Sequence, residues 1–97
     1  MTATPHDGYA QLSTTFWRSP KTLTLLRTNP TALGYFPLLL SWSSDNSTGG
    51  FLPANVITGL FAVPDNALTA LVSAGFLEQA QDGYEICDDA DWKLRRS

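Results

Sequence analysis

The feature that constrains this chain most is a change of pattern at Gly75. Before Gly75, the apolar residues Leu68, Leu71 and Val72 recur at the spacing of one helix face. After it, residues 76–87 change to the pattern of a strand, a turn and a second strand. Glycine at a helix end supplies a positive φ, and the next apolar residue folds back onto the last turn. The sequence therefore predicts a helix that stops at Gly75 and leads directly into a β-hairpin.

Asp82 and Gly83 supply the turn of this predicted hairpin. An Asp-Gly pair readily adopts the positive φ values that a tight two-residue turn needs. A turn at these two residues also predicts how the strands pair. The predicted register places Ala80 opposite Glu85, Gln79 opposite Ile86, and Glu78 opposite Cys87.

Proline residues mark the beginnings of the first two predicted helices. Ser19 before Pro20, and Asn29 before Pro30, each combine a capping side chain with a proline in the first turn. The second helix also contains Pro37, which removes one backbone hydrogen bond and crowds the preceding turn. We therefore expect this helix to kink or restart at Pro37.

Two further helices are predicted before Gly75. Segment 45–50 is polar and glycine-rich, which indicates a loop, and Pro53 then opens a helix that runs through Phe61. Asp65 or Asn66 caps the next helix. Two helices joined by so short a break form a candidate helix-turn-helix.

The charges after the hairpin predict one last short helix around Trp92. Asp88 and Asp89 precede this tryptophan, and Arg95 and Arg96 follow it. Acidic residues before a helix and basic residues at its end both favour the helix dipole.

This order of elements predicts the fold class. Helices, a helix-turn-helix and a hairpin follow one another as in a winged helix, an α+β fold that is mostly helical with a C-terminal β-hairpin wing. The 97 residues are enough for one domain, which we expect at 9–97, with residues 1–8 as a flexible arm. A charged share of only 15% favours a folded domain over disorder.

The residue types argue against several kinds of chemistry. Cys87 is the only cysteine, so one chain cannot form an internal disulfide. His6 is the only histidine and lies in the expected N-terminal arm, which argues against a histidine-based catalytic or zinc site. No glycine-rich phosphate loop ending in lysine occurs. No apolar run approaches the roughly 20 residues of a membrane span, and the N-terminus lacks a signal-peptide pattern. We expect a cytoplasmic, non-enzymatic protein with no cofactor, no metal and no membrane partner.

Charge is distributed unevenly along the chain, whose formal net charge is -3. Residues 1–44 carry +2 and the last five residues +3, whereas residues 45–92 contain eight acidic residues and no lysine or arginine. Clustered lysine and arginine supply most of the sequence-independent affinity for nucleic acid. Any DNA contact therefore depends on the two ends of the chain.

Three stretches resemble a known family. Leu12–Lys21 resembles the opening of the N-terminal domain of phage replisome organisers. Leu39–Ser43 followed by Thr48–Pro53, and Val72–Glu78 followed by Asp82–Ile86, resemble actinobacterial prophage members of that family. The resemblance covers roughly residues 9–92. It implies a winged-helix domain without enzymatic activity that acts in phage or plasmid replication initiation, through origin DNA and through self-association that helps recruit a helicase.

Duplex DNA is the first candidate partner. Asn66 and Thr69, in the second helix of the helix-turn-helix, are candidates for hydrogen bonds to base edges, although capping and solvent exposure are the more common reasons for such residues. The candidate phosphate-binding cations lie near the two chain ends, where a solvated surface also explains them. These cations are Arg18, Lys21, Lys93, Arg95 and Arg96.

A protein partner is the competing hypothesis. The acidic helix-turn-helix and hairpin suit a basic protein, because complementary charge accelerates association. Tyr9 and Trp17 are candidates for an exposed patch that mediates homo-oligomer formation, or for the core. A transcriptional or anti-repressor role on the same fold stays open.

Overall fold

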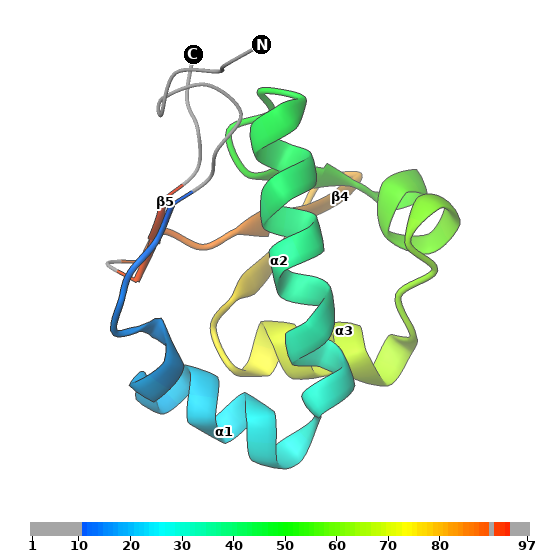
Figure 1. The fold of residues 1–97 in the computed structure, drawn as a ribbon. Coiled ribbons are helices and arrows are strands. Elements are labelled where there is room, and N and C mark those ends of the chain that lie inside the picture. Colours follow the sequence, from blue (N-terminus) through cyan, green and yellow to red (C-terminus); the bar gives the residue numbers. More distant parts are fainter. Residues whose placement is uncertain (1–10, 90, 94–97) are drawn as a thin grey trace, which may run out of the picture.

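The computed structural model describes residues 11–89 and 91–93, which form a mixed α+β structure that is mostly helical (Figure 1). The α+β class predicted from the sequence is confirmed at this level. The elements in chain order are β1 (Gln11–Leu12), the 3-10 helix η1 (Phe16–Arg18), α1 (Pro20–Thr28), α2 (Pro30–Asp45), β2 (Phe51–Pro53), the π-helix η2 (Val56–Leu60), α3 (Asp65–Ser73), β3 (Leu77–Ala80), β4 (Gly83–Ile86) and β5 (Trp92–Lys93).

The described strands form two antiparallel sheets. Strand β4 is the centre of a three-stranded sheet in the order β2-β4-β3, so the strand between the helices pairs with the second strand of the hairpin. Strands β1 and β5 pair with each other and bring residues 11–12 beside residues 92–93. Figure 1 shows this small sheet on the opposite side of α2 from η2.

Helix α2 supplies the centre of the core. Its buried side includes Ala32, Phe36, Leu39 and Leu40, which recur at helical spacing. Leu52 from β2, Ile57 from η2, Leu71 from α3 and Phe76 close around it without exposure to solvent. Burying one such side chain stabilises the fold by about 1.5 to 3 kcal/mol.

The predicted starts of α1 and α2 are confirmed, but their capping differs. The Asn29 side chain accepts a hydrogen bond from the Ala32 backbone N–H at 3.0 Å, as a capping residue should. Ser19 precedes Pro20 but makes no capping bond with its hydroxyl. Of the predicted kink or restart at Pro37, the restart is wrong, because α2 is one helix from Pro30 to Asp45 with the exposed Pro37 inside it.

The helix predicted from Pro53 to Phe61 is only partly present. Pro53 belongs to β2, and the helical residues that follow include the π-wound segment η2, where the Phe61 N–H donates to the Val56 carbonyl at 3.0 Å. The wider turn leaves Val56 and Ile57 buried but Leu60 62% exposed.

Helix α3 begins after a proline and ends as predicted. Neither Asp65 nor Asn66 caps it: Pro64 is the N-cap, and Asp65 is already the first helical residue. Gly75 has φ +85°, and the Phe76 N–H donates to the Leu71 carbonyl at 2.9 Å. This geometry confirms the glycine stop and turns the chain into β3.

The hairpin is confirmed, but its predicted turn and register are wrong. The turn residues are Gln81 and Asp82, and the observed pairs are Ala80 with Gly83, Gln79 with Tyr84, Glu78 with Glu85, and Leu77 with Ile86. Asp82 alone carries the positive φ of 65°.

Gly83 is needed for close packing rather than for the turn. It lies in β4 opposite Pro53, where an added Cβ would clash with the Leu52 carbonyl oxygen. The register is set by this approach of β2, which the hairpin sequence does not reveal. A shift of two residues leaves each side chain on its predicted face.

The predicted helix around Trp92 is wrong within the described residues. Trp92 and Lys93 form β5 opposite β1, and the Ser13 N–H donates to the Asp91 carbonyl at 2.7 Å. The Trp92 indole is buried against Phe36 and Phe76 and donates to the Cys87 carbonyl at 2.9 Å. These contacts outweigh the weak local preference for a helix. The predicted arm at 1–8 lies outside the described residues.

Candidate functional site

A groove lies between α3 and the β3–β4 hairpin and has a volume of about 490 Å³. Leu68 and Val72 from α3 and Tyr84 from β4 are half-buried and give it apolar walls. The groove therefore offers apolar contact area beside polar groups that can orient a ligand. Its remaining lining residues are Asp65, Thr69, Ser73 and Gln79.

The two elements that form this groove carry acidic residues and no lysine or arginine, and Asp65 is the acidic residue that lines it. Asp65 on α3 and Glu78, Asp82 and Glu85 on the hairpin are all exposed. The sequence between residues 45 and 92 contains no lysine or arginine that would offset them. Phosphate is repelled by such a surface, whereas a basic segment is attracted to it.

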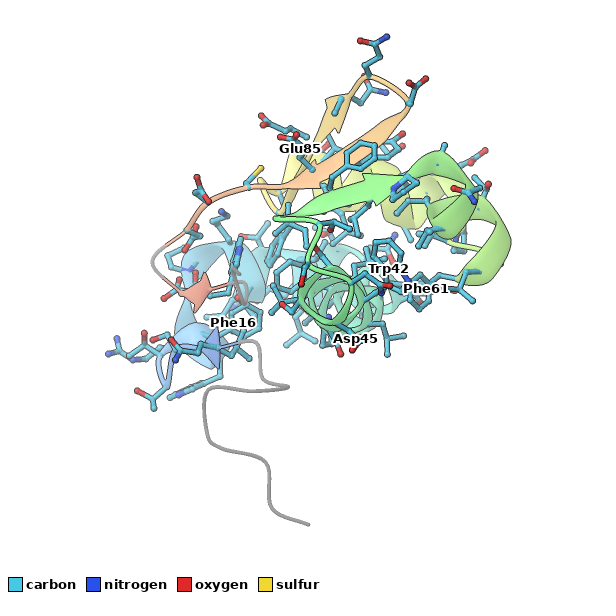
Figure 2. The ribbon with its side chains drawn as sticks, turned by 90° about the horizontal axis from the view of Figure 1, so that it is seen from above. Phe16, Trp42, Asp45, Phe61 and Glu85 are labelled. Carbon is cyan, nitrogen blue, oxygen red and sulfur yellow. The ribbon has the colours of Figure 1, made fainter. Side chains whose placement is uncertain are left out.

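The sheet face away from the core carries a row of three side chains, one from each strand. Phe51 of β2 pairs with Glu85 of β4, and Glu85 pairs with Glu78 of β3. Residues directly opposite in a sheet point to the same side, so these three form one line across it, which we call the outer row. Figure 2 shows Glu85 on the side of the sheet that faces away from α2.

Lys21, a predicted DNA contact, is engaged within the protein. Its Nζ lies 2.7 Å from Asp89 Oδ2, and it also lies 4.8 Å from the centre of the Trp92 ring and 5.5 Å from that of Phe76. Its side chain also passes over Gly75, where an added Cβ would approach Lys21 Cε to 3.2 Å.

The Lys21 contact alters the protonation of Asp89. Partial burial acts to raise the pKa of this carboxyl group, but hydrogen bonds from Lys21 and from the Asp91 backbone outweigh it. The pKa of Asp89 therefore lies below its usual value, and its charged form is the one that the fold favours.

The fold brings the two ends of the described chain together, as DNA contact through both ends requires. Lys93 in β5 pairs with Gln11 in β1, and Arg18 is exposed at the end of η1. The predicted residues Arg95, Arg96 and Tyr9 lie outside the described residues.

The other predicted residues lie on separate surfaces. Thr69 lines the groove, whereas Asn66 lies outside it and its backbone carbonyl accepts a bond from the Asn29 side chain at 3.3 Å. Trp17 is 69% exposed on η1, so it is on the surface and not in the core.

Cys87 and the acidic residues show no reactive arrangement in the described part of the chain. Burial raises the pKa of the Cys87 thiol, and the nearby Glu78 carboxylate raises it further. Residues 11–89 and 91–93 contain no group of three metal-ligating side chains placed to hold an ion. Within the same residues, no helix is long and apolar enough to cross a bilayer.

Sequence reasoning missed the groove walls and the outer row for different reasons. The helical spacing of Val72 predicts a core residue, but Val72 is only half-buried and its remaining surface faces the hairpin. Phe51 lies in a strand too short to predict a partner, so its position beside Glu85 depends on the pairing of β2 with β4. The predicted hairpin already placed Glu78 and Glu85 on the same face of the sheet, and the observed shift of two residues brings them directly opposite each other.

Comparison with known proteins adds no family to this description. No protein-family model, curated protein or solved structure was found to match the chain. The function is therefore inferred from the charges and the geometry of the groove and the outer row.

Proposed function

We propose that this chain is a non-enzymatic winged-helix module that binds a basic segment of a partner protein through the acidic surface of α3 and the β3–β4 hairpin. The order α2, β2, η2, α3, β3, β4 supports the winged-helix assignment, because a three-stranded sheet in the order β2-β4-β3 lets the hairpin act as the wing.

The uniform charge of this surface is the observation that carries the proposal. In many winged helices the second helix of the helix-turn-helix enters the major groove and the wing contacts phosphate. Here those elements carry Asp65, Glu78, Asp82 and Glu85, and no lysine or arginine. Each of these charges opposes DNA and favours a cationic partner.

The groove indicates what kind of segment fits. Leu68, Val72 and Tyr84 offer apolar contacts, and Asp65 lies at the same groove. A short amphipathic segment would place apolar side chains against these walls and its lysine or arginine side chains toward the acidic residues. The resemblance to replisome organisers favours phage or plasmid replication as the setting.

Binding of a labelled amphipathic leucine-lysine peptide, followed by fluorescence anisotropy, tests this proposal. We expect saturable binding that weakens as salt is added, and roughly five- to tenfold weaker binding for Asp65→Asn. Val72→Ser should also weaken binding, because it removes apolar contact in the groove. Asp45→Asn is the charge-matched control, since Asp45 is exposed at the end of α2 and does not line the groove. Equal binding by the wild type and all three variants would reject the proposal.

Duplex DNA contact through the paired chain ends is a second candidate function. The β1–β5 pairing favours it, because it brings Lys93 beside the segment that leads to the exposed Arg18. With at most five or six phosphate contacts, the slope of log affinity against log salt would be about -5. Anisotropy with labelled duplex DNA at low salt should show weaker binding for the double variant Arg95→Ala/Arg96→Ala. Coincident curves would exclude this second function.

A further inference from the structure

We infer that the outer row of Phe51, Glu85 and Glu78 is a docking surface for an arginine side chain of the protein partner. The inference rests on the proposed function for the existence of a basic partner. It adds a second contact area on the sheet face opposite the core and specifies the side chain that this area receives.

Strand register places the three side chains within reach of one guanidinium group. Phe51 and Glu85 are directly opposite across β2 and β4, and Glu85 and Glu78 are directly opposite across β4 and β3. Such pairs have Cβ atoms about 4.5 to 5.5 Å apart. The buried residues Leu77 and Ile86 belong to the other face of the sheet, so the outer row faces away from the core.

The two glutamates of the outer row lie opposite each other without a compensating cation among the described residues. Like charges directly opposite each other destabilise an antiparallel pair. Among the described residues, no lysine or arginine forms an ion pair with Glu78 or Glu85, and Lys21 pairs with Asp89 instead. A cation supplied by the partner would remove the repulsion and gain a hydrogen bond to each carboxylate.

Phe51 gives the outer row a preference for arginine over lysine. The planar guanidinium group stacks on aromatic rings and donates hydrogen bonds in a fork that matches carboxylates, whereas the lysine ammonium acts as a point charge. Phe51 is half-buried, so part of this residue stays accessible to a ligand. An arginine over Phe51 can therefore donate to Glu85 and Glu78 together.

The neighbouring row leaves room for the backbone of the partner. Pro53, Gly83 and Ala80 form the next line across the same face, and none carries a long side chain. Gly83 must stay small because β2 approaches it so closely. A segment lying along this row would project its arginine into the outer row without obstruction.

Titration of the isotope-labelled chain with acetylated hexa-arginine and hexa-lysine peptides tests the inference, with amide chemical shifts as the readout. We expect the arginine peptide to bind the wild type two- to fivefold more tightly, about the gain from one exposed cation–π contact. Phe51→Leu should abolish this preference, and Glu85→Gln should weaken arginine binding about tenfold. Asp82→Asn is the matched control, because it removes one negative charge from the same hairpin outside the outer row. Thermal unfolding of each variant confirms that it folds.

The possible results separate this inference from the proposed function. Equal binding of the two peptides, with Glu85→Gln no weaker than Asp82→Asn, would overturn the arginine site. Weakening by Asp65→Asn in the same experiment would then still support the acidic groove. If neither peptide binds the wild type, the arginine site is rejected, and binding of the leucine-lysine peptide then decides the proposed function separately.

Discussion

Two pairs of charged residues, Lys21 with Asp89 and Glu78 with Glu85, have opposite electrostatic character. Lys21 and Asp89 form an ion pair at 2.7 Å, with the ammonium group close to the Phe76 and Trp92 rings. Glu78 and Glu85 are of like charge and face each other across the exposed hairpin. The first pair joins α1 to the segment that leads into β5, whereas the second leaves a local repulsion that no ion pair among the described residues relieves.

The comparison teaches where stability and binding are located in this molecule. Around Lys21, opposite charges and aromatic rings join α1 to the segment that ends in β5. On the hairpin, the described residues provide no compensating cation, and the core contributes only through the other face of the sheet. Substitutions around Lys21 should therefore reduce stability, and substitutions of Glu78 or Glu85 should change binding.

The largest expected effect is a loss of stability when Trp92, whose ring lies near Lys21, is replaced. Trp92 is 4% exposed and contacts Phe36 at 4.8 Å and Phe76 at 5.1 Å between ring centres. We expect Trp92→Ala to lower the free energy of unfolding by about 3 to 5 kcal/mol in chemical denaturation. The exposed Trp17 is the control, and Trp17→Ala should change stability by less than about 0.5 kcal/mol. Equal losses of stability in the two variants would show that the packing of Trp92 against Phe36 and Phe76 does not stabilise the fold.

The second-largest expected effect is a loss of stability when Gly83 in the hairpin is replaced. Gly83→Ala places a Cβ against the Leu52 backbone carbonyl and should destabilise the fold by about 1 to 3 kcal/mol. Gly34→Ala is the matched control, because no atom lies within 4 Å of the added Cβ inside α2. That control should stabilise the protein by about 0.5 to 1 kcal/mol, and both free energies come from urea denaturation. A stable Gly83→Ala variant would contradict the close approach of β2 to β4.

The ion pair predicts a smaller effect that depends on pH. Lys21→Met keeps the apolar side chain near the rings but removes the charge, and should lower stability by about 1 to 2 kcal/mol at pH 7. Because folding lowers the pKa of Asp89 below its usual 3.8, the contribution is complete above that value and is lost as pH falls through the folded-state pKa.

Denaturation of wild type and Lys21→Met at pH 7 and in acid measures this dependence. The difference between them should shrink as the pH falls below 3.8, since Asp89 becomes protonated in both. Arg18→Met, which removes an exposed cation from η1, should keep the pH dependence of the wild type. A difference that stays constant in acid would disprove the contribution of the ion pair.

The smallest expected effect is a gain in stability when Glu78 in the outer row is replaced. Glu78→Gln removes the repulsion from Glu85 and should stabilise the free protein by about 0.2 to 1 kcal/mol. The gain should decrease in high salt, where the repulsion is screened. Asp82→Asn changes the net charge equally in the turn and should gain less. If Glu78→Gln destabilises the protein, the two carboxylates do not repel each other as inferred.

Much of the fold could be predicted because local signals were strong. The glycine stop at Gly75, the proline starts of α1 and α2 and the existence of the hairpin depend on residues close together in sequence. The acidic character of α3 and the hairpin was also predictable, since the acidic residues and the absence of cations between residues 45 and 92 can be counted in the sequence. The apolar walls of the groove were not, because they come from separate elements.

The wrong predictions concern features that distant residues control. Asp82–Gly83 is a good local turn, but the contact of Leu52 with Gly83 moves the glycine into the strand. The charges around Trp92 favour a helix weakly, but burial of its indole among the core aromatic rings outweighs them. In both cases a contact across the fold is stronger than the local preference.

By itself, the sequence determined the starts of α1 and α2, the end of α3 at Gly75, the presence of a hairpin and the concentration of negative charge after residue 44. These properties follow from backbone preferences and charges that act over a few residues. Only the tertiary structure decided that Lys21 meets Asp89 and that Glu78 meets Glu85 beside Phe51. Such pairings depend on strand register and packing between distant segments, and the free energies that select them come from contacts formed only when the chain folds.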